Sequence, residues 1–389
     1  MTYLLSKKGK MAALLAITVL AFVLIATLAH KETAPYLLIT SADASSVIYQ
    51  LPKNTKKLFE ISTAQKNHSI TKTNESQALV LSQQALEAYQ NTAKSRYLRI
   101  AKSALQPWWH DEKPSAALWL LRGRILQTQH KFEEAAIDLT TLSANYPQLS
   151  EARLLATDAW RRAGQLTKAK KACFAVALSA RPLLAQFCAV EILLTAGDYD
   201  NANRLVEKAL ANLAFLSNSE QRWAQAIYAD TLLATGDING AAQVWLTITA
   251  DNNTALSYKL AYADVLLTLS RPQEAIHILE ETGTAMPVLL RRAAAAKALN
   301  DPGFKSMTRS LNTQFNFTKK TAEANLHLRE QALYFLWIED DAEQALRLAT
   351  KNWKFQKGWE DAELVLNIAK KIGDRSSIKR INDWREAQR

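Results

Sequence analysis

The sequence contains little glycine, proline and cysteine. Among its 389 residues are 10 Gly and 9 Pro, too few turn-forming residues for a β-sandwich, a β-barrel or an enzyme built around glycine-rich loops. The two Cys exclude a disulfide-rich scaffold and a cysteine-rich metal site, although they allow one disulfide. A content of 48% hydrophobic and 22% charged residues excludes a disordered chain. The composition therefore predicts an all-α protein with a large buried core.

Motifs that carry chemistry are also missing. The chain has no His-Glu-x-x-His metal motif, no phosphate-binding glycine loop and no Gly-x-Ser-x-Gly nucleophile turn. Its six His show no metal-ligand spacing, and a site at residues 108–112 would require consecutive side chains to converge on one ion. We therefore predict no enzymatic activity, no metal and no cofactor, and an enzyme is the last of the functional alternatives.

One long uncharged run lies near the N-terminus. Residues 11–29 carry no charge and would span about 28 Å as a helix, close to the hydrocarbon thickness of a bilayer. Three lysines in residues 1–10 precede the run, so the positive-inside rule predicts a cytoplasmic tail there and an extracytoplasmic location for the rest. We predict an uncleaved transmembrane anchor. The alternative is a signal peptide that is cleaved after the small residues at 27–29.

The net charge of +11 is unevenly distributed along the chain. Residues 1–29 carry +3 and residues 30–74 another +3, which leaves +5 for residues 75–389. Because an extracytoplasmic chain rarely meets nucleic acid, we predict no nucleic-acid partner; the basic residues either lie against anionic lipid or are simply solvated. Residues 30–74 are rich in Ser, Thr, Asn and Lys without an apolar period, which predicts a flexible linker.

From about residue 75 the apolar residues follow a helical period, and the pattern repeats. Turn residues recur at spacings of 34, 33, 39 and 34, and each is followed five positions later by an alanine. The turn residues and their alanines are His130 and Ala135, Gly164 and Ala169, Gly197 and Ala202, Gly236 and Ala241, and Ser270 and Ala275. Small residues are expected where two helices approach closely. Roughly eight or nine such helix pairs fit residues 75–389.

This pattern resembles the tetratricopeptide repeat, an antiparallel helix pair of about 34 residues. One repeat matches the signature of that family at Trp119, Gly123, Phe132, Ala135 and Pro147. The likeness is clearest over residues 110–285. The resemblance implies a right-handed α-solenoid over residues 75–389, in which divergent repeats cap the two ends.

Two segments, residues 97–109 and 349–353, resemble a bacterial subgroup of membrane-anchored tetratricopeptide proteins. The subgroup implies no established activity. It implies a location in the bacterial inner membrane with the repeat domain in the periplasm, and an integral membrane protein as one candidate partner. The oligomeric state stays open, because the exposed faces of end repeats allow self-association.

Positions six residues before a turn face the concave side of such a solenoid. At four consecutive turns this position is acidic, and the residues are Asp158, Glu191, Asp230 and Asp264. We predict that these acids attract a basic protein or peptide partner, with Phe187 and Trp223 as apolar anchors on the same surface. The alternative is that the acids pair with Arg161, Arg162 or Lys259 and that the two aromatic residues belong to the core.

The two cysteines stand symmetrically about the predicted helix connection at residues 179–182. Two antiparallel helices joined there place Cys173 and Cys188 at the same height. In an oxidising compartment this arrangement permits a disulfide that closes a fifteen-residue loop, worth about 3 kcal/mol. The alternative is a pair of buried thiols. A catalytic role is not predicted, because no His lies near either residue in the sequence.

These features together predict a membrane-anchored extracytoplasmic scaffold that binds a protein or peptide in its concave groove and assembles an envelope or membrane complex. A second possibility is an accessory protein that binds an acidic envelope polymer through basic surfaces such as residues 370–389, where seven Lys and Arg stand against three acids. Salt would weaken polymer binding and spare an apolar peptide site. Reversing the charge of the four acids would abolish only groove binding of a basic partner.

Overall fold

The computed structural model describes residues 74–179, 181–251, 254–318 and 325–388. These residues form helices and no strand. Among them, no helix combines the length and the apolar character that a membrane crossing requires. The predicted cytoplasmic tail, the predicted membrane span at residues 11–29 and nearly all of the predicted linker lie outside the described residues.

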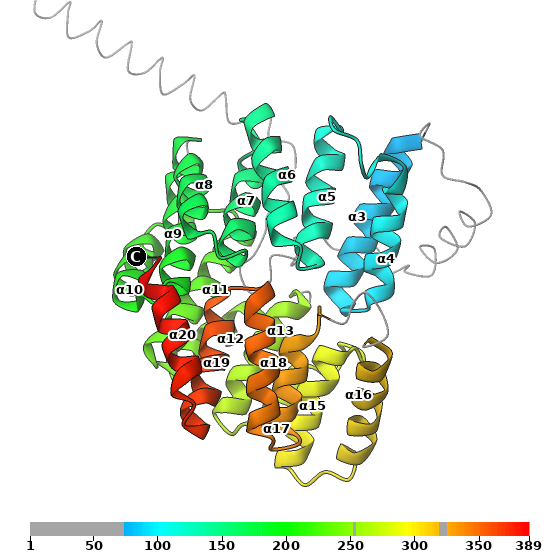
Figure 1. Ribbon diagram of the computed structural model, residues 1–389, viewed down its shortest axis with the longest axis vertical. Helices are drawn as coiled ribbons and strands as arrows, with labels where there is room; N and C mark the ends of the chain where they lie inside the picture. Colours follow the sequence, from blue (N-terminus) through cyan, green and yellow to red (C-terminus); the bar gives the residue numbers. More distant parts are fainter. Residues whose placement is uncertain (1–73, 180, 252–253, 319–324, 389) are drawn as a thin grey trace, which may run out of the picture. The chain divides into compact units, whose positions relative to one another are not determined.

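Eighteen α-helices in the described residues form nine consecutive pairs (Figure 1). The pairs are α3 (Glu75–Thr92) and α4 (Ser95–Ala104), α5 (Ala116–Thr128) and α6 (Phe132–Asn145), α7 (Ser150–Arg162) and α8 (Leu166–Leu178), α9 (Pro182–Thr195) and α10 (Tyr199–Leu210), α11 (Asn218–Thr235) and α12 (Ile238–Thr249), α13 (Leu256–Thr268) and α14 (Pro272–Ile278), α15 (Met286–Ala298) and α16 (Phe304–Thr318), α17 (Leu328–Trp337) and α18 (Ala342–Phe355), and α19 (Trp359–Ile372) and α20 (Arg375–Glu386). Two short 3-10 turns, η2 (Gln106–Trp108) and η3 (Leu213–Phe215), follow α4 and α10.

Each helix packs mainly against its neighbours in the sequence. In addition, the first helices of successive pairs contact one another, as α7 does α9 and α9 does α11. The first helices therefore form one layer and the second helices cover it. This two-layer stack of helix pairs is the arrangement expected from the sequence pattern.

The alanines that recur after each predicted turn lie where helices touch. Ala135, Ala169, Ala202, Ala241 and Ala275 are all buried, with at most 1% of their surface exposed. In the second pair, a Cβ atom at Gly123 would come within 2.7 Å of the Leu139 side chain, so only glycine lets these two helices approach so closely. The prediction that small residues mark helix contacts is confirmed.

All nine turns inside the pairs contain one residue with a positive φ angle. Four of these residues are glycines and five are not, and the full set is Ala93, His130, Gly164, Gly197, Gly236, Ser270, Asn300, Asp340 and Gly373. A left-handed residue after the last helical turn lets the chain reverse and satisfies carbonyl groups at the helix end. In an L-residue with a Cβ atom, this conformation costs about 1–2 kcal/mol.

Replacing an exposed non-glycine residue at such a turn should stabilise the protein. Ser270 is exposed and has a φ of 58°, so Ser270→Gly removes the steric cost and is expected to raise the free energy of unfolding by about 1 kcal/mol. Gly236 has a φ of 91° and open space around it, so Gly236→Ala should lower the free energy by a similar amount. Urea unfolding of both variants measures the two effects, and shifts of equal sign would contradict the explanation.

Candidate functional site

The four predicted acids lie on neighbouring first helices. Asp158 is on α7, Glu191 on α9, Asp230 on α11 and Asp264 on α13, all close to the C-terminal ends of these helices. We call this surface of α7, α9, α11 and α13 the inner face. The acids therefore share one layer, as their equal distance from each turn predicted.

The C-terminal repeats of the same chain cover the inner face at α7 and α9. The backbone N–H of Lys357 donates a hydrogen bond to the carbonyl oxygen of Arg162 at 2.9 Å. Helix α19 contacts α9. Further along, the Tyr199 hydroxyl donates to Glu363 Oε1 at 2.5 Å, and the guanidinium of Arg385 donates to the same oxygen at 3.1 Å. Residues about 160 to 200 positions apart in the sequence thus form one interface.

A buried network of charged side chains joins the inner face to the C-terminal repeats. Asp158 accepts hydrogen bonds from Arg161 and from Arg162, the latter at 3.1 Å, and Arg161 also lies 3.3 Å from Glu191. Across the interface, Arg162 lies 3.6 Å from Glu360 on α19. The predicted alternative, in which the acids pair with Arg161 and Arg162, is the arrangement that the structure has for Asp158 and Glu191.

Residues of α17 and α19 complete the network. Arg329 lies 3.4 Å from Glu360 and 3.6 Å from Asp361. The carboxyl of Asp361 accepts further hydrogen bonds from Asn352 at 2.8 Å and from Gln356 at 3.0 Å. Because Asp361 is only 1% exposed, these bonds replace the water that the carboxylate loses on burial.

The network holds more carboxyl groups than guanidinium groups, and the pKa values reflect this. Burial by itself raises the pKa of Asp158, but Arg162 and Arg161 hold it below the ordinary value. Burial raises the pKa of Glu191 to about 7, against the pull of Arg161. Burial and the nearby Glu360 raise the pKa of Asp230 to about 8. At neutral pH, the carboxyl group of Asp230, which has no ion pair among the described residues, is therefore mostly protonated.

The structure corrects the prediction of an open groove with exposed aromatic anchors. Phe187 and Trp223 are 0% and 4% exposed and pack edge to face with 5.9 Å between ring centroids. Both are therefore core residues. The prediction failed because the helical period places a residue on a first helix but does not tell its exposed side from the side that packs on the next pair. Asp264 forms a bidentate pair with Arg291 of α15, with both N–O distances 2.8 Å.

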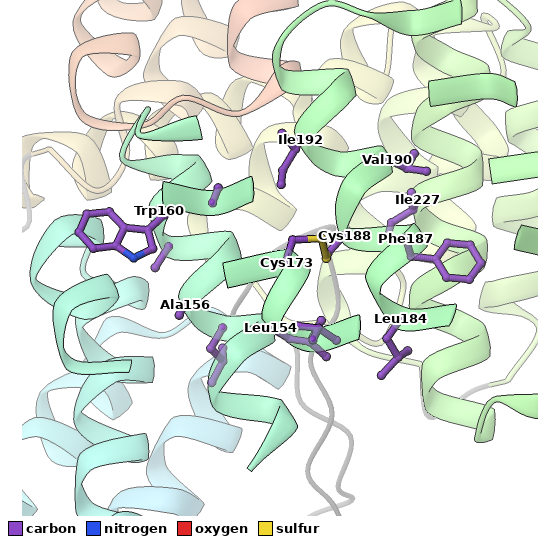
Figure 2. Packing of buried hydrophobic residues seen from close by; sticks show 14 of the residues in the cluster. Leu154, Ala156, Trp160, Cys173, Leu184, Phe187, Cys188, Val190, Ile192 and Ile227 are labelled. Atoms are coloured by element: carbon purple, nitrogen blue, oxygen red, sulfur yellow. A yellow bond between two sulfur atoms is a disulfide. The ribbon is translucent and has the colours of Figure 1, made fainter. Parts of the chain in front are cut away.

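Cys173 on α8 and Cys188 on α9 form a disulfide, with their Cα atoms 6.0 Å apart. Figure 2 shows the sulfur atoms inside the core, near Leu154, Leu184 and Phe187. Both cysteines are at most 5% exposed. The disulfide therefore ties the third pair to the fourth in the interior, and one of its cysteines shares α9 with Glu191.

Removing this disulfide should destabilise the repeat domain without altering its helix content. The double variant Cys173→Ala/Cys188→Ala is expected to lower the free energy of unfolding by about 3 kcal/mol, because the unfolded chain regains the entropy of a fifteen-residue loop. Denaturant titration measures the change. An equal loss after simple reduction of the wild type is the matched control, and no loss in either sample would contradict the assignment.

A cavity of about 320 Å³ lies next to the network, among the first helices. It is lined by polar residues that sequence reasoning did not single out, among them Gln90, Gln127 and Ser257, and by the turn residue His130. Neutral side chains far apart in the sequence give no local pattern, so only the fold brings them together. Within the described residues, no group of three or more His, Cys, Asp or Glu is placed to hold a metal ion.

The helix pairs, their spacing of 33 to 39 residues and the buried alanines at each helix contact define the repeat. The fold is a stack of helix pairs that resemble the tetratricopeptide repeat. No family model and no curated protein matches the chain, so the resemblance to a bacterial membrane-anchored subgroup stays a prediction. The chain is similar to the crystal structure of the tetratricopeptide domain of P58(IPK), with 13% identity, 82% of this chain and 99% of that chain covered, and a TM-score of 0.18.

Proposed function

We propose that this protein is a non-catalytic scaffold, anchored in the bacterial inner membrane by residues 11–29 and displaying its repeat domain in the periplasm, where it binds a protein partner. The uncharged N-terminal run supports the anchor. The buried disulfide supports a periplasmic location, because structural disulfides persist in oxidising compartments. The stacked helix pairs support a binding role, since such stacks present long helical surfaces.

The observation that carries the proposal is an exposed apolar pair on the outer layer. Phe174 and Leu178 lie one turn apart on α8 and are 65% and 74% exposed. Large apolar side chains that share one helix face and remain in water are typical of docking sites. Lys170 and Lys171 of the same helix are exposed too, so the surface suits an amphipathic partner segment with acidic residues.

This surface replaces the concave groove as the proposed contact. The inner face at α7 and α9 is occupied by the C-terminal repeats, and the remaining cavity of about 320 Å³ is too small for a helical peptide. On the outer side of α8, Lys170 donates a hydrogen bond to the carbonyl oxygen of Gln388 at 3.0 Å, but the apolar pair itself is accessible as it stands.

Photo-crosslinking in native membranes tests the proposal. The full chain carrying Phe174→Ser and Leu178→Ser should capture at least about tenfold less of a specific partner than the wild type, because a docking site loses its apolar centre. The control is Leu246→Ser on α12, which also removes a half-exposed apolar side chain. Equal capture by both variants would contradict the assignment of this surface. Capture that disappears in high salt with either variant would instead favour the acidic-polymer alternative.

A further inference from the structure

The cavity, which is partly open to solvent, has the size and lining of a small ligand site. Its wall combines residues of α3, α5, α6, α7, α11, α13, α15, α17 and α19, so distant repeats contribute to one space. Tyr89, Phe132 and Trp359 provide aromatic surface, and Leu233 and Leu260 provide aliphatic surface. A volume of about 320 Å³ fits one small organic molecule or one long side chain.

Four polar side chains on this wall have atoms without a hydrogen-bond partner among the described residues. The unpartnered atoms are Oε1 and Nε2 of Gln90, Oε1 of Gln127, Nδ1 of His130 and Oγ of Ser257. Gln90 and Gln127 are only 8% and 3% exposed. The orientation of the Gln127 amide is determined, because its nitrogen donates to Leu155 O and Asp158 Oδ2. The side-chain oxygen of Gln127 is therefore a hydrogen-bond acceptor without a donor among the described residues.

Most of the unmet atoms are acceptors. Both amide oxygens accept hydrogen bonds, a hydroxyl oxygen can accept, and a neutral imidazole accepts through one nitrogen. Burial lowers the pKa of His130 to about 4, so its ring is neutral at physiological pH. A buried acceptor without a donor costs about 1–3 kcal/mol. The cavity is therefore suited to a ligand that supplies several donors.

Two carboxyl groups around the cavity, those of Asp230 and Glu330, form no ion pair among the described residues. The ionisable groups on the wall are Tyr89, His130, Arg162, Asp230, Asp264, Arg291, His327, Arg329, Glu330 and Glu360, and Arg161 and Glu191 lie close to Asp230. Arg291 is held by Asp264, Arg162 by Asp158 and Glu360, and Arg329 by Glu360 and Asp361. Asp230 has a hydrogen bond from Trp359 but no ion pair among the described residues.

We propose that this cavity binds an alkylammonium group, with Asp230 as its counter-ion, and that the group belongs either to a free diamine or polyamine or to a lysine side chain of a partner protein. An ammonium group has three donors for the acceptors of Gln90, Gln127 and Ser257. The aromatic faces of Tyr89 and Trp359 add cation–π attraction. An anion would meet Asp230 and Glu330 without a free cation. The site is separate from the proposed docking surface on α8 and does not depend on it.

Binding should depend on pH in a definite direction. Burial, reinforced by Glu360 and Glu191, raises the pKa of Asp230 to about 8, so the carboxyl group is mostly protonated at pH 7. An ammonium ligand has to displace that proton. Its affinity should therefore rise as the pH is raised toward about 8 and level off above it.

Calorimetric titration of the purified full chain at about pH 8 tests the proposal. The probes are cadaverine, spermidine, a short blocked peptide with one lysine, and pentanediol as the uncharged counterpart of cadaverine. At least one amine should bind, and pentanediol should not. Binding of the free amines identifies a metabolite-type ligand, whereas binding of the peptide alone identifies a lysine side chain of a partner, and both results support the ammonium site.

Variants separate the site from general effects of charge and folding. Asp230→Asn should weaken amine binding by about 100-fold, and Gln90→Leu by about tenfold, while both proteins keep cooperative thermal unfolding. The side-chain amide of Gln90 forms no hydrogen bond in the described residues, so its replacement removes an acceptor and breaks no existing hydrogen bond. Asp200→Asn on the exposed side of α10 makes the same charge change and should leave binding unaltered. The proposal is overturned if no amine binds the wild type, if pentanediol binds as well as cadaverine, or if Asp230→Asn binds normally; the cavity then holds water only.

Discussion

Raising the pH from about 6.5 to about 8 should lower the free energy of unfolding of this protein by about 2–3 kcal/mol. Asp230 supplies most of the change. Its pKa is raised to about 8 in the folded chain by burial and by Glu360, whereas an unfolded Asp is ionised throughout this range. The folded state therefore holds a proton that the unfolded state does not. Stability conferred by that proton is complete at low pH and is lost as the pH rises through 8.

Two other carboxyl groups also lose their protons in this pH range. Burial raises the pKa of Glu191 and of Glu151 to about 7, and each adds to the loss in the same direction. Burial lowers the pKa of His130 to about 4, so its effect has the opposite sign. That effect ends at about pH 6.5, where an unfolded His has already lost its proton, and the range above it isolates the carboxyl groups.

Thermal unfolding of wild type and Asp230→Asn over this pH range provides the measurement. The variant keeps the hydrogen-bonding capacity of the side chain but cannot ionise, so its stability should change by about 2 kcal/mol less than that of the wild type. At the alkaline end, the variant should be the more stable protein. Asp200→Asn, with an exposed side chain on α10, should follow the wild type. Parallel curves for wild type and Asp230→Asn would contradict a raised pKa at this position.

Replacing Arg162 should have the second large effect, a loss of about 3–5 kcal/mol of unfolding free energy. The Arg162 side chain is 4% exposed and lies between Asp158 of its own helix and Glu360 of α19. Arg162→Met keeps much of the side-chain volume but leaves two buried carboxylates with less compensation. Because the guanidinium spans the interface, the C-terminal repeats should loosen first. Hydrogen exchange should therefore increase in α19 and α20 more than in α5 or α6.

A second variant separates the network from simple loss of packing. Adding Glu360→Gln to Arg162→Met removes one of the stranded charges and should restore part of the lost stability. The exposed pair Arg347 and Glu343 is the control, and Arg347→Met should change the free energy by less than about 0.5 kcal/mol. A uniform rise in hydrogen exchange over all helices would show that Arg162 does not act at the interface in particular.

Helix contacts within and between neighbouring pairs could be predicted from local spacing. A turn residue and an alanine five positions later recur because the two helices of each pair approach closely at the same place. Ala135, Ala169 and Ala202 are buried there, as expected. The helix count also follows from the period. At Ala93 and Asn300 the turn has the same left-handed conformation without a glycine, so a search for glycine alone would miss these pairs.

The amino-acid sequence by itself determined the all-α class, the repeat, the position of each turn and the shared layer of Asp158, Glu191, Asp230 and Asp264, because these depend on contacts between residues less than about two repeats apart. Only the tertiary structure decided what covers that layer. The contacts of Arg162 with Lys357 and Glu360 join residues nearly 200 positions apart, and no local period records them. Burial under the C-terminal repeats then set the pKa values of the acids and brought residues of distant repeats to one cavity, since both depend on how the ends of the stack meet.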